Sequence, residues 1–337
     1  MSDSVELTRY LRLARPMLRG EDVLWVQSRL QAGGWPGGVA GLVRSADGLF
    51  GARTAEAVAA LQRGCGLAVD GVAGPEVWAR LRLGPRRGDP AALAAECRRV
   101  ATASDPAARL APEALAALAQ PHARSGGGAL WCLTAAGLAT GRGAVPAGPA
   151  HEAAVARVLR DWFPAPIQAA ARRYGVPVEL IVACLCTESA GSGGDARAVA
   201  AAERWEPGFR NYAETPHRVS IGCMQTLIST AAATLGRPVS PEELRRPEVS
   251  IAAGTGFIAE AAGRTLLDPP VVACAYNAGS VRHDPSEANR WRMLQYPLGT
   301  GAHADRFVAY FNAALRLLRT DPALAGGAPS FAAALPG

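Results

Sequence analysis

The sequence contains no lysine, few aromatic residues and no long apolar run. All 35 of its Lys/Arg residues are arginine, against 29 acidic residues, which gives a formal charge of +6. This balance suits an anionic partner, but the chain lacks the blocks of five or more basic residues that are typical of nucleic-acid-binding segments. No stretch of about 18 apolar residues runs without a charge, so we expect no transmembrane helix. We therefore expect neither a nucleic-acid partner nor membrane insertion.

The spacings of cysteine and histidine match none of the common metal or disulfide patterns. The seven cysteines are odd in number and fit no zinc or redox motif, which favours free thiols in a reducing compartment. The five histidines are scattered and have no neighbour at ligand spacing. We predict no metal and no cofactor. The N-terminus has no apolar stretch followed by a small-residue cleavage site, so we expect cytoplasmic synthesis without a signal peptide.

The first 83 residues contain an internal repeat. The stretch "DGLFGART" at 47–54 returns as "DGVAGPEV" at 70–77, and "VLWVQ" at 23–27 returns as "VAALQ" at 58–62. An Asp-Gly pair forms a tight turn because glycine tolerates positive φ, and the apolar spacing within the second element is helical. The repeat predicts a small bundle of three helices joined by glycine turns.

This repeat resembles the peptidoglycan-binding domain of cell-wall enzymes over residues 18–81. The chain departs from that pattern by an insertion, "WPGGVAGLVRSA" at 35–46, and by Val77 where a threonine is usual. The resemblance implies that the domain holds the glycan and the stem peptide of the wall in a shallow groove. A purely structural helical module is the alternative.

A single carboxylate ends an apolar stretch in "LIVACLCTESAGSG" at 180–193. Pro177 marks the start of a predicted helix whose faces are all apolar, as in a helix inside a domain. Glu188 ends this helix, where desolvation and the negative helix terminus both favour the protonated carboxyl group. An acid held neutral at about pH 6–7 suits a general acid for a glycosidic oxygen. A buried glutamate satisfied by local hydrogen bonds is the alternative.

Two further motifs follow Glu188 and Ser189 in order. They are "GCMQ" at 222–225, which we place at the mouth of a new helix, and "AYNAG" at 275–279. Together the three segments resemble the lytic transglycosylase (lysozyme-like) family over about residues 165–318. The chain has Cys223 where that family has leucine. The interval between Glu188 and Gly222 is longer than in the housekeeping enzymes of that family. It holds "ERWEPGFRNY", which resembles the phage-type branch.

The resemblance implies cleavage of the β-1,4 bond between N-acetylmuramic acid and N-acetylglucosamine, with formation of 1,6-anhydromuramic acid. Glu188 is expected to act first as the acid and then as the base. The residues expected to bind the substrate are Ser189, Gly222, Met224, Gln225, Tyr276 and Asn277. For Met224 and Tyr276, packing in the core is the alternative.

The reaction type depends on whether a second carboxylate takes part. A hydrolytic muramidase on the same fold is the main alternative, and an inverting one would need a second carboxylate to activate water. By resemblance Glu206 is the best-placed candidate, and Glu203 and Asp195 are weaker ones. Arg204 or Arg210 is expected to pair with Glu206, and such a structural ion pair favours the transglycosylase. A particle component that docks to the wall without cutting it is the alternative from another class.

We predict a mainly α fold with a small three-helix bundle and a helical lysozyme-like domain of the soluble lytic transglycosylase type. The expected segments are a peptidoglycan-binding domain at 1–84, a helical connector and Pro/Gly-rich linker at 85–155, a lytic transglycosylase domain at 156–322 and a C-terminal tail at 323–337. The expected partner is the peptidoglycan glycan strand, bound by a monomer. The enzyme is expected to reach the wall after release, injection or particle delivery, as a phage endolysin or a virion-associated lysin.

Overall fold

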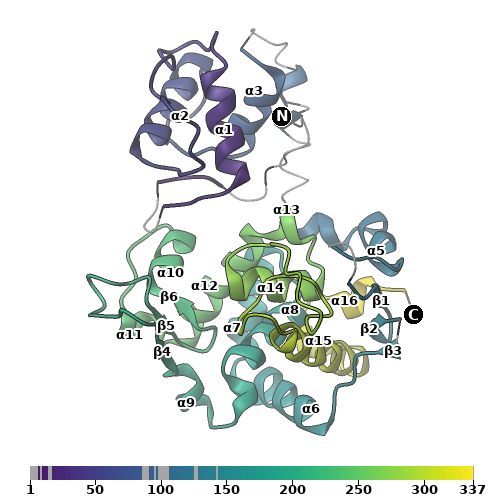
Figure 1. Cartoon of the computed structure of the whole chain (residues 1–337). Coiled ribbons are helices and arrows are strands. Elements are labelled where there is room, and N and C mark those ends of the chain that lie inside the picture. The colour runs from purple at the N-terminus through teal and green to yellow at the C-terminus, as the bar shows by residue number, and fades with distance from the viewer. Residues whose placement is uncertain are drawn as a thin grey trace. The chain divides into compact units, whose positions relative to one another are not determined.

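The computed structural model describes residues 7, 10–13, 17–85, 91–94, 96–97, 106–124, 128–141 and 143–336. The chain is mainly helical and divides into two compact units, residues 1–105 and 106–337 (Figure 1). Part of the predicted connector, including 86–90 and 98–105, lies outside the described residues. Among the helices that the structure describes, none is both long and apolar enough to cross a membrane.

The first unit is the predicted bundle of three helices. These are α1 (Glu21–Gln31), α2 (Ala52–Cys65) and α3 (Pro75–Leu83). Pro75 occupies the first position of α3, where its missing N–H would have no helical partner in any case. Trp25 of α1 stacks on Trp78 of α3 with ring centroids 4.5 Å apart, in a core that also contains Phe50. The aromatic pair joins the first and last helices of the bundle.

Two buried glutamines explain the internal repeat. The amide nitrogen of Gln27 donates to the Asp47 carboxylate at 2.9 Å, and its amide oxygen accepts the Gly48 N–H at 2.8 Å. Gln62 bonds to the Asp70-Gly71 turn in the same way, at 2.7 and 2.9 Å. Each glutamine therefore holds the Asp-Gly turn that follows it in the chain, and the two halves of the repeat unit are bonded to each other.

Helix α8 (Val178–Glu188) lies in the middle of the second unit. Figure 1 shows α14 and α15 beside it, and α8 also contacts α6, α7 and α12. The other helices of this unit are α5 (Pro112–Ala119), α6 (Pro149–Ala156), α7 (Pro164–Tyr174), α9 (Ala196–Ala200), α10 (Ile228–Leu235), α11 (Pro241–Leu244), α12 (Pro247–Glu260), α13 (Ala262–Thr265), α14 (Pro269–Ala278), α15 (Ala302–Thr320) and α16 (Phe331–Ala334). Single turns of other helix types are η1 (Pro106–Leu110), η2 (Arg157–Trp162), η3 (Ala190–Ser192) and η4 (Pro322–Ala325).

A small antiparallel sheet follows α9. Its strands are β4 (Glu203–Trp205), β5 (Val219–Ile221) and β6 (Thr226–Leu227), paired in that order. Ile221 lies opposite Thr226, so residues 222–225 form the turn of a hairpin. We predicted this motif at the mouth of a helix. The prediction is wrong in detail, because the turn leads into β6 and only then into α10.

The predicted helical connector is wrong for residues 131–144. They form a second antiparallel sheet of β1 (Trp131–Thr134), β2 (Gly137–Thr140) and β3 (Gly143–Ala144). Trp131 and Leu133 are buried while the residues after each are half-buried, which is the period-two pattern of a strand with one face in the core. The side chain of Asn312 on α15 bonds both the N–H and the carbonyl of Leu138, at 2.7 and 3.1 Å. This segment is therefore part of the second unit.

The predicted tail also packs into the second unit. Phe331 of α16 is fully buried. The buried carboxylate of Glu179, in the first turn of α8, accepts the Ser330 hydroxyl at 2.7 Å and the Ala332 N–H at 2.8 Å. Burial raises the pKa of Glu179, and these hydrogen bonds act in the opposite direction. The C-terminal segment thereby fixes the start of the helix that ends at Glu188.

Replacement of Gln62 by Leu is expected to destabilise the first unit by about 2 kcal/mol, because the Asp70 and Gly71 N–H groups lose their acceptor. Hydrogen–deuterium exchange of the full chain over residues 52–83 measures this change. Gln31→Leu is the control: Gln31 is exposed and makes one long bond of 3.3 Å, to the Val43 carbonyl. Equal effects of the two substitutions would contradict the role of Gln62.

Candidate active site

Glu188 lies at the end of α8, as predicted, and its side chain is 7% exposed. Burial raises the pKa of Glu188 to about 7, although the positive charges of Arg204 and Arg306 oppose this rise. A carboxyl group with such a pKa is present in both the protonated and the ionised form near neutral pH. It can therefore give a proton and then take one back without a large change in free energy.

Arg204 of β4 pairs with Glu206, the second predicted carboxylate, and its positive charge also acts on Glu188. Its guanidinium Nε lies 3.4 Å from Oε1 of Glu206. The predicted ion pair of Glu206 is thus present and is made by Arg204, while Arg210 lies 4.0 Å from Glu214. Both members of the Arg204–Glu206 pair are exposed, so the pair contributes little to folding. Its effect is to place a positive charge beside Glu206.

The two weaker carboxylate candidates have structural roles. Glu203 accepts hydrogen bonds of 2.8 to 2.9 Å from the side chains of Arg245, Tyr212 and Trp205. Although burial alone would raise the pKa of Glu203, these three donors lower it below its usual range. Asp195 caps α9 by accepting the Ala198 N–H at 2.8 Å. Both carboxylates therefore stabilise the segment around β4.

The hairpin turn is bonded directly to the residue after the acid. The Ser189 hydroxyl donates to the Cys223 carbonyl at 2.6 Å. Gly222 has a φ of +82°, and a Cβ there would overlap the Leu244 carbonyl oxygen, so the position requires glycine. Gln225 also has positive φ, and its amide nitrogen donates to the Gly222 carbonyl at 2.9 Å. These contacts hold the turn beside Glu188, and contact of the same residues with a sugar stays a prediction.

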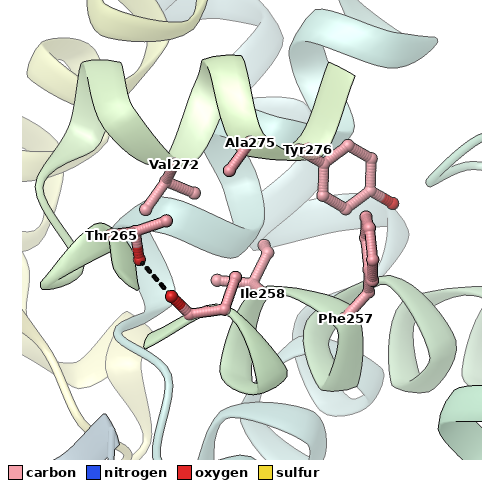
Figure 2. Close-up of a pocket in the computed structure, with 7 residues that line it drawn as sticks. Phe257, Ile258, Thr265, Val272, Ala275 and Tyr276 are labelled. Carbon is pink, nitrogen blue, oxygen red and sulfur yellow. Dashed lines mark hydrogen bonds between the residues drawn. The ribbon is translucent and has the colours of Figure 1, made fainter. Parts of the chain in front are cut away.

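Met224 and Tyr276 pack inside the domain. Met224 is fully buried, and the Tyr276 hydroxyl donates to the Met224 carbonyl at 2.7 Å. Figure 2 shows the Tyr276 ring beside Phe257 at a small hollow, with its hydroxyl directed away from Val272. The residues that line this hollow are Phe257, Ile258, Ala261, Thr265, Val272, Ala275 and Tyr276. The hollow is apolar, since its one other hydroxyl donates to a backbone carbonyl. It is therefore a packing gap between helices and does not suit a glycan.

The sequence analysis missed His303. This residue lies in the first turn of α15, its side chain is 5% exposed, and its Nε2 lies 3.6 Å from Oε1 of Glu188. The other ring nitrogen, Nδ1, lies 3.4 Å from the amide nitrogen of Asn277. Burial lowers the pKa of His303 to about 4, and the charges of Arg306 and Arg204 act in the same direction. The ring is therefore neutral near pH 7. No sequence motif marks the position.

A groove of about 310 Å³ lies on the first unit, beside the start of α2. Residues 42–45 of the predicted insertion form part of its wall, together with the Asp47 turn and Arg53. Arg44 and Arg53 are exposed there. The insertion thus enlarges a surface that the internal repeat builds.

The described residues offer no site for a metal. No group of three or more His, Cys, Asp or Glu side chains among them is arranged to hold an ion. Four of the seven cysteines, Cys184, Cys186, Cys223 and Cys274, are buried thiols.

Comparison with known families assigns both units. Residues 19–81 match the family model of the putative peptidoglycan binding domain, and residues 165–293 match that of the transglycosylase SLT domain. No curated protein matches the chain. The second match contains Glu188, the hairpin turn and the Tyr276 motif. The chain therefore joins a peptidoglycan-binding domain to a transglycosylase SLT domain and is a modular lytic transglycosylase that acts on the cell wall.

Proposed function

We propose that the second unit cleaves the glycan between N-acetylmuramic acid and N-acetylglucosamine and closes a 1,6-anhydro ring, with Glu188 as both acid and base. The observation that carries the proposal is the environment of Glu188, a buried carboxyl group with a pKa of about 7 at the end of α8. The three other candidates are engaged elsewhere: Glu203 and Asp195 in hydrogen bonds, and Glu206 in its ion pair.

The proposed reaction needs one proton and no water. Protonated Glu188 donates to the bridging oxygen, and the N-acetylglucosamine side leaves as an alcohol. The 2-acetamido group of the muramic sugar stabilises the positive charge that develops at C1 of that sugar. The Glu188 carboxylate then takes the proton of the muramic C6 hydroxyl while that oxygen bonds to C1. Arg204 and Arg306 favour the ionised form of Glu188 between the two steps.

The pairing of Glu206 supports this reaction over hydrolysis. An inverting hydrolase needs a second carboxylate as the base for a water molecule. The Glu206 carboxylate is instead paired with Arg204, whose Nε lies 3.4 Å from Oε1 of Glu206. A wall-docking component without activity has less support, because the pKa of about 7 of the buried Glu188 suits proton transfer.

The first unit is proposed to hold the glycan and stem peptide in the groove beside α2. Its exposed Arg44 and Arg53 suit the carboxylates of a stem peptide. The phage-like element at 203–212 supports a phage endolysin or a particle-associated lysin. Such an enzyme is made in the cytoplasm, acts as a monomer and meets the wall after release, injection or particle delivery.

Replacement of Glu188 by Gln is expected to slow the clearing of purified peptidoglycan by at least about 100-fold, because an amide can neither donate nor take the proton. Glu179→Gln is the matched control, since it also removes a buried carboxylate from α8, at the opposite end of the helix. It should lower the melting temperature but keep clearing where the protein is folded. Near-normal clearing by folded Glu188→Gln would assign the acid to another residue.

Digestion in ¹⁸O-water is expected to give anhydro products without solvent oxygen in the new muramic end. Glu206→Gln should reduce activity by about fivefold or less, because only an exposed ion pair is lost. Glu214→Gln, which removes the Arg210 ion pair from the same loop, is its control. Mass spectrometry reads the label. Label at the reducing end, together with inactive Glu206→Gln, would identify a hydrolytic lysozyme.

A fragment of residues 106–337 is expected to cut glycan but to sediment with insoluble walls less than the full chain. Residues 1–84 should co-sediment and cut nothing. The fragment starts at 106 because Trp131, whose indole N–H lies 3.0 Å from the Asp268 carboxylate, belongs to the core of the second unit. If the 1–84 fragment remains in the supernatant at low salt, its role as the wall anchor is wrong.

A further inference from the structure

Asn277 occupies a fixed orientation between a backbone N–H and a histidine. The N–H of Tyr296 donates to Oδ1 of Asn277. The amide nitrogen of Asn277 consequently faces Nδ1 of His303, at 3.4 Å. The opposite orientation would set the NH₂ group of Asn277 against the Tyr296 N–H, which are both donors. The Tyr296 N–H therefore determines that the NH₂ group of Asn277, and not its oxygen, faces His303.

The amide in turn fixes the tautomer of His303. An NH₂ group is a donor, so the ring nitrogen that faces it has to be the acceptor, and the proton of the neutral ring resides on Nε2. Nε2 is the atom that lies 3.6 Å from Oε1 of Glu188. This distance exceeds a hydrogen bond, so the contact is between an N–H dipole and a carboxyl oxygen in a site shielded from water. Contacts of this kind shorten in the catalytic complex.

We propose that Asn277 and His303 are positioning residues for Glu188, in which the Asn277 amide holds His303 as the Nε2–H tautomer and this N–H stabilises the ionised carboxylate. The proposal rests on the proposed role of Glu188 as acid and base. The effect is selective, because an N–H dipole favours the ionised over the protonated carboxyl group. This arrangement of Asn277 and His303, here called the relay, thus stabilises the Glu188 carboxylate after Glu188 has given its proton to the leaving sugar. It transfers no proton itself.

Four other ionisable groups act on Glu188 from the elements packed around it. Arg204 of β4 and Arg306 of α15 are exposed, so water screens both charges. Burial raises the pKa of Tyr276 on α14 and of Cys184 on α8, so both stay protonated. Among the described groups, His303 is therefore the buried donor that acts on Glu188 directly.

Loss of the Nε2–H is expected to raise the pKa of Glu188 above its wild-type value. His303→Phe keeps a ring of similar size and removes the donor. Its Glu188 should stay protonated to a pH about one unit higher, and the alkaline limb of kcat/KM should move up by the same amount. A merely structural role of His303 would lower activity at every pH without moving that limb. His283→Phe, at an exposed histidine, should leave the limb in place.

Two measurements on the full chain test the relay without any cleavage assay. In ¹⁵N NMR of labelled histidine, His303 should show a protonated Nε2 and a bare Nδ1 near pH 7, with His303→Phe identifying its signals. In ¹³C NMR of labelled glutamate, the Glu188 carboxyl, assigned with Glu188→Gln, should titrate higher in His303→Phe. Asn277→Ala should release the tautomer and give a mixture of the two forms.

A proton on Nδ1 in the wild type, or an unchanged titration of Glu188 in folded His303→Phe, would overturn the proposal. If His303→Phe does not fold, the wild-type tautomer and the Asn277→Ala spectrum still decide it. An absence of glycan cleavage together with the expected spectra would contradict the proposed function and leave the relay standing.

Discussion

Desolvation of one carboxyl group is the constraint on which the second unit depends. Glu188 has a pKa of about 7 because its side chain is almost shielded from water. A helix terminus is ordinarily open to solvent, so neighbouring elements have to cover it. Ser189 attaches the hairpin turn to this end of α8, and α15 brings His303 against the carboxyl group. Segments far apart in the chain therefore meet at one side chain.

The two glutamates of α8 show what burial does with and without donors. Burial raises the pKa of both side chains. Glu179 is satisfied by the Ser330 hydroxyl and by the N–H groups at the start of α16, and this arrangement suits a carboxylate that only fixes the fold. Glu188 has the 3.6 Å contact with His303 and two screened arginines. Both protonation states of Glu188 are therefore accessible near neutral pH, which suits acid–base catalysis.

Local patterns predicted the parts of the fold that local contacts determine. The doubled Asp-Gly turn indicated the three-helix bundle because each turn is bound by a glutamine of its own repeat unit. Apolar residues on every face of α8 indicated its burial and placed Glu188 at its end. The strand at 131–134 was missed because four residues in an alanine-rich segment carry little periodicity. His303 was missed because its contacts with Asn277 and Glu188 arise only from tertiary packing.

The bond between Glu179 and the start of α16 also makes the packing of α8 depend on residues that are synthesised late. Translation reaches Ser330 only after every other described element of the second unit has been made. Until then the Glu179 carboxylate lacks these donors, and burying it is unfavourable. The helix that carries the acid therefore depends for its burial on residues that lie far from Glu188 in the chain.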